Sequence, residues 1–242
     1  MLAFFRKFRI KQLVSGRTSR YVLYAIGEIA LVVIGILIAL QVNNWNEERK
    51  AEQLELVTLQ ELRNNIEANV QEIDSVFKRV DTRVKSIQSL LNNFSQQSPM
   101  SDSLVRHFSW ATGYDRINLH VGAYNSYISA GSQIIKDEKL RFEINTYFDN
   151  ALGELKGFIE ELRDDFYSYM LGYQRNEFTE IRSQDKIAIP RSYDKLRLNE
   201  SFILSMGIFL DVQLSARSCL NRTRDKSLRL LTEIDRRITE IE

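Results

Sequence analysis

The sequence predicts an all-α protein in which one N-terminal transmembrane helix continues into an extracytoplasmic up-and-down helical bundle. Three observations lead to this prediction. A run of mostly apolar residues occupies positions 21–42, and apolar side chains recur every three or four residues over much of the remaining chain. The 242 residues include only two prolines, and no six-residue segment alternates cleanly between apolar and polar side chains, as a half-buried strand would.

Composition excludes several classes of protein. Hydrophobic residues make up 44% of the chain, which is too many for a disordered protein. A single cysteine, Cys219, excludes a disulfide framework and any four-cysteine metal site. The net charge is +1, but residues 1–20 hold six Lys/Arg and no acid, which leaves residues 21–242 with a net charge of −5. Because phosphate binding needs a basic surface, no nucleic-acid partner is expected.

Residues 1–20 are expected to form a short basic tail in the cytoplasm. Three phenylalanines stand among its cations, a mixture that favours binding to an anionic membrane surface. The residues predicted to contact that surface are Arg6, Lys7, Arg9 and Lys11.

Residues 21–42 are expected to be the transmembrane helix. At ~1.5 Å per residue the segment rises ~33 Å, enough to cross a hydrocarbon core of ~30 Å. Tyr21, Tyr24 and Trp45 stand near its two ends, where amphipathic rings favour the headgroup level. A cleaved signal peptide is the alternative, but its apolar run would be shorter and would end at a small-x-small site, which residues 39–43 do not provide.

The flanking charges predict the orientation. Short flanks rich in Lys/Arg stay in the cytoplasm, whereas the distal flank, residues 43–50, is nearly neutral. Residues 43–242 are therefore expected outside the cytoplasm. In a bacterium this places the span in the inner membrane and the bundle in the periplasm.

Two blocks of sequence carry a family resemblance. The first is FFRKFR followed by YVLYAIGEIALVVIGILIALQVNNWNEERK, and the second is YNSYISAGSQIIKDEKLRFEINTYF, from Tyr124 to Phe148. Together they resemble an uncharacterised bacterial family of single-span membrane proteins, a group defined by a domain of unknown function. The resemblance covers the first fifty residues well and the middle of the chain loosely. It implies a membrane anchor and a helical exterior domain, and no activity, substrate or catalytic residue.

After the span, apolar spacing predicts the helices of the bundle. One helix is expected to run from the membrane to about Phe94, because a seven-residue repeat continues without a break. A loop follows at 96–102, then helices at 102–111, at 118–130 and from Asp137 to about Tyr173. Residues 180–191 are predicted to be a loop, and Asn199 is predicted to cap the last helix. The repeat consists of Leu59, Ile66, Ile73, Val80, Ile87 and Phe94.

Polar residues interrupt the predicted apolar faces at four positions. Asn69 and Arg83 interrupt the first helix, where they are expected to fix register at a cost in stability. Arg217 and Arg224 fall on the predicted face of the last helix. The apolar residues of that face are Ile203, Met206, Leu210, Leu214, Leu220, Leu228, Leu231, Ile234, Ile238 and Ile241. Two interpretations stay open for these arginines: a polar layer with carboxylate partners, or the place where the face turns to solvent.

Glu28 is the residue whose position most needs a reason. A carboxylate in hydrocarbon costs at least ~2.5 kcal/mol, so such groups usually face protein or water. We expect one side of the span to contact a partner helix, in a second copy or in another membrane protein, with small residues allowing close approach. The residues predicted to make this contact are Tyr24, Glu28, Gly35 and Ala39.

Two other roles for Glu28 stay open. The carboxyl group could be protonated, or reach the membrane interface, without any partner. Alternatively, Glu28 could carry protons in a membrane complex, by analogy with the single-span proteins of ion-driven motors, which share this architecture.

Patterns typical of catalysis, cofactors and metals do not occur in the sequence. His107 and His120 have no HExxH motif or cysteine pair beside them, and no glycine-rich phosphate loop or GxSxG elbow occurs. The carboxylates at 160, 161, 164 and 165 are expected on the wet face of a helix. The aromatic residues of the middle third are expected to pack in the core, a ligand pocket being the alternative. No cofactor is therefore expected.

The resulting hypothesis is a non-enzymatic, membrane-anchored envelope protein that acts through protein–protein interaction or assembly. Its expected partners are the lipid bilayer and either a second copy or another membrane protein. The alternatives are a ligand-sensing periplasmic bundle and a proton-coupled component of a membrane complex. A twenty-residue cytoplasmic tail is too short for an output domain, so any signal would have to pass through a partner.

Overall fold

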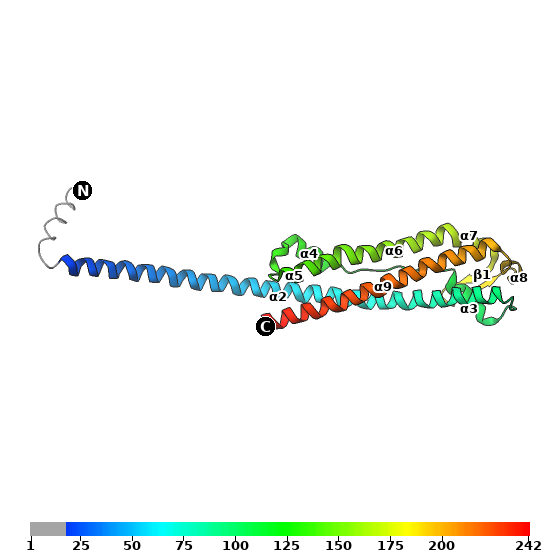
Figure 1. The fold of residues 1–242 in the computed structure, drawn as a ribbon, viewed down its shortest axis with the longest axis horizontal. Coiled ribbons are helices and arrows are strands. Elements are labelled where there is room, and N and C mark those ends of the chain that lie inside the picture. The colour runs from blue at the N-terminus through cyan, green and yellow to red at the C-terminus, as the bar shows by residue number, and fades with distance from the viewer. Residues whose placement is uncertain (1–17) are drawn as a thin grey trace. The chain divides into compact units, whose positions relative to one another are not determined.

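The structure, a computed structural model, describes residues 18–242. Its contacts divide the chain into two compact units, with the boundary between Leu54 and Glu55. The helix α2 (Thr18–Ser95) contributes to both units. The described residues are helical apart from one two-stranded sheet and the connecting segments (Figure 1), which confirms the predicted all-α class.

In the first unit, α2 has no other element beside it among the described residues. Between residues 21 and 54, every side chain that the structure describes is exposed, including the apolar ones. A Cβ atom added at Gly27 or Gly35 would meet no atom within 4 Å beyond its chain neighbours and the backbone of its own helical turns. Among the described residues of this unit, none therefore covers the apolar surface of the span.

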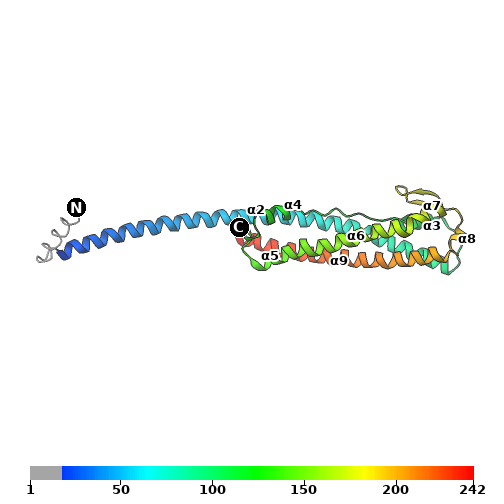
Figure 2. The same cartoon turned by 90° about the horizontal axis from the view of Figure 1, so that it is seen from above.

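The second unit is built on three long helical stretches (Figures 1 and 2). The first is α2 from Glu55 onward. The second is a nearly continuous helix that comprises α5 (Glu138–Asn145), η2 (Thr146–Ala151), α6 (Leu152–Asp165), η3 (Phe166–Met170) and α7 (Leu171–Glu177). The third is α9 (Glu200–Ile241), which packs beside α6 and forms ion pairs with α2.

The core of this unit confirms the seven-residue repeat of α2. All six residues of the repeat are buried, as are the flanking Leu62, Val76, Val84 and Leu90. A stripe wider than a coiled-coil seam is needed because α2 packs against more than one neighbour. The buried apolar residues form two clusters, one around Phe108 and Phe202 and one around Tyr127 and Ile144.

The chain returns along α2 in an extended conformation. The helix α3 (Asp102–Ala111) has the predicted bounds, but α4 is Gly122–Ala130, so the prediction of helix from residue 118 was wrong. Asn69 explains the difference: its amide donates to the carbonyl of His120 (2.9 Å) and accepts from the same residue's N–H (2.6 Å). These bonds satisfy backbone groups that a helix would otherwise have to pair internally.

Helices end or begin at three residues where the sequence predicts: Gly131, Asp137 and Asn199. Gly131 closes α4 at φ +105°, with its N–H donating to the carbonyls of Tyr127 and Ile128. The side chain of Asp137 accepts from the Leu140 N–H at the start of α5, and that of Asn199 accepts from the Phe202 N–H at the start of α9.

The segment between α7 and α9 is a β-hairpin and a short helix, so the prediction of a loop at 180–191 was wrong. β1 (Phe178–Arg182) pairs antiparallel with β2 (Ile187–Pro190), and α8 (Tyr193–Leu196) follows. The strands have five and four residues, too short for an alternation rule that spans six. Phe178 and Ala188 are buried, and the hairpin packs beside α3 and α7.

In the N-terminal half of α9, the buried face differs in part from the predicted one. The buried residues there are Phe202, Met206, Phe209, Gln213, Ala216, Cys219 and Leu220, whereas Ile203, Leu210 and Leu214 are only half-buried. Three of the seven are Gln, Ala and Cys, which have small or polar side chains. Met206 and Leu220 are buried as predicted, but the other buried positions lie one residue before the predicted ones.

Gln213 gives a first testable prediction. Its side chain is fully buried in α9, and neither its Nε2 nor its Oε1 has a hydrogen-bond partner among residues 18–242. An unsatisfied buried polar group costs about 1–3 kcal/mol. We expect Gln213→Met, similar in length and apolar, to raise the free energy of unfolding by that amount, measured by amide hydrogen exchange of α2 and α9. Gln71→Met, at an exposed position of α2, should change it little, and an unstabilised Gln213→Met would contradict the prediction.

Candidate functional site

The predicted contact residues lie together on one side of the first unit. Tyr24, Glu28, Gly35 and Ala39 all belong to α2 and are exposed. At ~100° per residue their side-chain directions fall within about 60° of one another. The structure thus places the four residues on a common face of the helix. Arg6, Lys7, Arg9 and Lys11 lie outside the described residues.

Two helices of the described chain are long and apolar enough to cross a membrane. In the helix that includes Tyr24, the apolar window is entirely unburied, whereas in α9 (Glu200–Ile241) a third of it is buried within the protein. A membrane-crossing helix must leave its apolar surface to lipid, whereas a core helix covers its own. Of the two, only the N-terminal helix leaves its apolar surface uncovered, as a lipid-exposed helix must.

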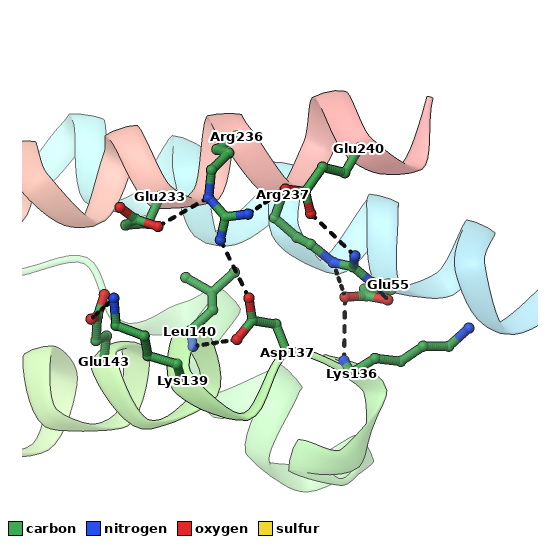
Figure 3. Close-up of polar contacts among 10 residues, drawn as sticks. All are labelled: Glu55, Lys136, Asp137, Lys139, Leu140, Glu143, Glu233, Arg236, Arg237 and Glu240. Carbon is green, nitrogen blue, oxygen red and sulfur yellow. Dashed lines mark hydrogen bonds and ion pairs between the residues drawn. The ribbon is translucent and has the colours of Figure 1, made fainter.

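The second unit begins with a buried ion pair. Glu55, the first residue of this unit, is 0% exposed, and its two carboxylate oxygens accept from Arg237 Nε (2.9 Å) and Nη2 (3.0 Å). One of these oxygens also accepts from the backbone N–H of Lys136 (3.2 Å). Glu55 therefore joins α2, the end of α9 and the loop before α5 (Figure 3). We call this arrangement the Glu55 clasp.

A second, more exposed set of charges lies beside the clasp (Figure 3). Arg236 forms ion pairs with Asp137 (3.4 Å), with Glu233 (3.1 Å) and with Glu240. The Asp137 carboxylate caps α5 by accepting from the Leu140 N–H, and this hydrogen bond lowers its pKa, which Arg236 lowers further. The carboxylates of Glu55 and Glu240 raise the pKa of the Arg237 guanidinium. Asp137 and Arg237 therefore stay charged over the physiological pH range.

Another buried ion pair holds the extended segment against α2. Asp115 is 6% exposed, and its carboxylate pairs with Arg79 (2.8 Å) and with the buried Arg83, which also donates to the Trp110 carbonyl (3.1 Å). Three residues further along the extended segment, the N–H of Asn118 donates to the Glu72 carboxylate. The polar interruption that Arg83 makes in the apolar stripe thus serves to bind the returning chain.

Arg217 and Arg224 form a polar seam between α9 and α2. Arg217 pairs with Asp81 (3.0 Å) and Arg224 with Asp74 (2.6 Å), and all four side chains are half-exposed. Both interpretations of these arginines therefore hold in part, because they have carboxylate partners and stand at the edge where the face meets solvent.

The remaining titratable candidates do not converge on a reactive centre in the part of the chain that the structure describes. His107 is bonded to the Ser86 hydroxyl (3.2 Å), and burial lowers its pKa, while His120 is exposed. No group of three or more His, Cys, Asp or Glu that could hold a metal occurs among residues 18–242. Burial and the neighbouring acids raise the pKa of Asp165.

The aromatic residues of the middle third belong mainly to the core. Tyr124, Tyr127, Tyr147, Phe148 and Phe166 are buried, and Tyr124 stacks on Phe148 at a ring separation of 4.5 Å. Phe142, Tyr167 and Tyr169 are exposed instead.

One open groove adjoins this aromatic region. It lies between α5–η2 and α9 and has a volume of about 420 Å³. Its lining residues are Phe142, Glu143, Thr146, Tyr147, Lys226, Arg229, Leu230, Thr232 and Glu233.

The Glu55 clasp and Asp115 were not predicted from the sequence. A signal for Glu55 was present, because stepping back seven residues from the buried Leu62 reaches position 55. A carboxylate at a core position of a helix implies a buried cationic partner. Asp115 has no comparable signal, since it stands in an extended segment without periodicity.

Comparison with known families assigns no chemistry to these residues. Residues 28–153 match a family of unknown function, DUF6090, which covers just over half of the chain. The chain belongs to the DUF6090 family. The DUF6090 region includes Glu28, Gly35 and Ala39, the Glu55 carboxylate and Asp115, but not Arg237. No curated protein and no solved structure matches the sequence.

Proposed function

We propose that this DUF6090 protein is a single-pass protein of the bacterial inner membrane, with its N-terminus in the cytoplasm and its bundle in the periplasm. In this proposal it acts in assembly. The face with Tyr24, Glu28, Gly35 and Ala39 binds a helix of a second copy or of another membrane protein.

One observation carries the proposal: the apolar residues of 21–42 whose side chains the structure describes are exposed, while the second unit has its own closed core. So large an uncovered apolar surface is not stable in water, and lipid is the environment that accepts it. Within lipid, a carboxylate at Glu28 favours a protein partner that can bond it, and small residues at 35 and 39 let that partner approach.

The proposal predicts that one side of the span crosslinks more than the other. Leu31 lies on the same side as Glu28, whereas Val33 points the opposite way at nearly the same depth. Both are large, apolar and exposed, so a photocrosslinking amino acid should be tolerated equally at either position. We expect a discrete crosslinked species in cells from position 31 at a yield at least fivefold above that from position 33.

Glu28→Leu should abolish the difference, because the partner's group would lose its bonding carboxylate. Equal yields at positions 31 and 33 would contradict the proposed contact. Orientation is checked separately with reporters fused after Glu242 that are active only in the cytosol or only in the periplasm, and a cytosolic signal would contradict the proposed topology.

A further inference from the structure

The groove between α5–η2 and α9 combines an apolar floor with exposed aromatic surface. Tyr147 and Leu230 form its buried floor, and Phe142 on one wall is 69% exposed. A volume of about 420 Å³ lies within the range of small-molecule sites. An exposed phenylalanine beside such a floor offers apolar area that the fold does not use.

The floor contributes no charge. The Tyr147 hydroxyl and the Ser227 hydroxyl are hydrogen-bonded to each other (3.0 Å). Burial raises the pKa of Tyr147, so the phenol stays neutral at physiological pH. The floor therefore presents carbon surface, and selectivity must come from the rim.

The rim carries two acids and two cations. Its two acids are each paired with a cation: Glu143 with Lys139 (3.7 Å) and Glu233 with Arg236 (3.1 Å), as Figure 3 shows. The two cations, Lys226 and Arg229, also line the groove, and neither forms an ion pair within residues 18–242, so both are open to an anionic ligand. Because they are three residues apart on α9, they stand on the same side of that helix.

The backbone is irregular at the same place. The π-helical segment η2 begins at Thr146, and Thr146 and Tyr147 both line the groove. Short π-helical segments inside α-helices occur frequently at functional sites, because the extra residue in the turn changes which side chains face a neighbour.

From these four features we propose that the groove binds an amphipathic anion, a molecule with an apolar chain or ring and one carboxylate or phosphate group. The apolar part lies over Leu230, against Phe142, and the anionic group lies between Lys226 and Arg229. This site is separate from the span, so it stands whether or not the span binds a partner.

The test uses the full-length protein in phosphatidylcholine nanodiscs, with empty nanodiscs as the blank. Octanoate, octyl phosphate and neutral octanol are titrated, and binding is followed by saturation-transfer NMR. We expect at least one of the two anions to bind at least tenfold more tightly than octanol. Preference for octanoate identifies a fatty-acid type of ligand, and preference for octyl phosphate identifies a lipid-phosphate type.

Variants localise the binding. Lys226→Gln/Arg229→Gln should reduce anion affinity to that of octanol, and Phe142→Ala should weaken both anions and octanol alike; the replaced side chains are exposed, so the fold should be kept. Lys78→Gln/Arg106→Gln removes two exposed cations elsewhere and should leave binding unchanged. Equal affinity for octanol and the anions, or full anion affinity in Lys226→Gln/Arg229→Gln, would overturn the proposal.

Discussion

Replacing Asp115 by alanine is expected to destabilise the second unit by about 3–5 kcal/mol. The replacement leaves the Arg83 guanidinium, whose side chain is 3% exposed, without its carboxylate, and an uncompensated buried charge costs about this much. Arg79 contributes less, because its more exposed side chain can turn to water. Amide hydrogen exchange of the buried part of α2 in the full-length protein measures the loss.

Two further variants separate the lost ion pair from the lost side chain. Arg83→Met/Asp115→Leu removes both charges, so it should be less destabilised than Asp115→Ala alone. Asp185→Ala removes an acid from the exposed pair with Arg182, and its effect should stay below about 1 kcal/mol. If Asp115→Ala cost no more than Asp185→Ala, the Arg83–Asp115 pair would not hold the extended segment in place.

The long helices could be predicted from sequence because their signals are local and repeated. Six apolar residues at a spacing of seven define the buried face of α2, and Asp137 and Asn199 cap their helices within three residues of chain. Each of these signals needs only neighbours along the chain, so a sequence is sufficient to read it.

The extended segment after α3 could not be predicted in the same way, because it is held by residues far away in the sequence. Its carbonyl and N–H groups pair with Asn69 and Glu72, which lie 46 to 51 residues earlier. An extended chain advances about 3.3 Å per residue and a helix about 1.5 Å. Each residue of the extended segment therefore spans the length of roughly two residues of α2. The contacts between them recur at different sequence spacings in the two segments, so neither spacing predicts the other.

The candidate sites show the same division. The four residues of the span face share one helix, so their spacing alone places them together. The groove and the Glu55 clasp each combine α9 with elements that lie about 80 or more residues earlier. Only the packing of the helices brings these side chains together, and the register of that packing depends on polar contacts such as those of Arg217 and Arg224.

Loss of the Glu55 clasp is expected to free the end of α9. Arg237→Leu leaves the fully buried Glu55 carboxylate with the backbone N–H of Lys136 as its only remaining donor of the clasp. Breaking a buried pair from one side costs about 3–5 kcal/mol. Because helix ends unfold locally at lower free energy than the core, the loss should appear first in the last turns of α9. Hydrogen exchange should accelerate there by at least a hundredfold, while the amides around Phe209 change less.

The matched control is Arg222→Leu, which breaks an exposed pair between α9 and Glu154 of α6 and should cost less than about 1 kcal/mol. Glu55→Leu/Arg237→Leu should recover part of the protection, since it leaves no buried charge without a partner. The clasp joins the C-terminal end of α9 to the first residue of the second unit. A uniform loss across α9 in Arg237→Leu, or exchange no faster than in Arg222→Leu, would show that the clasp does not fasten this end of the helix.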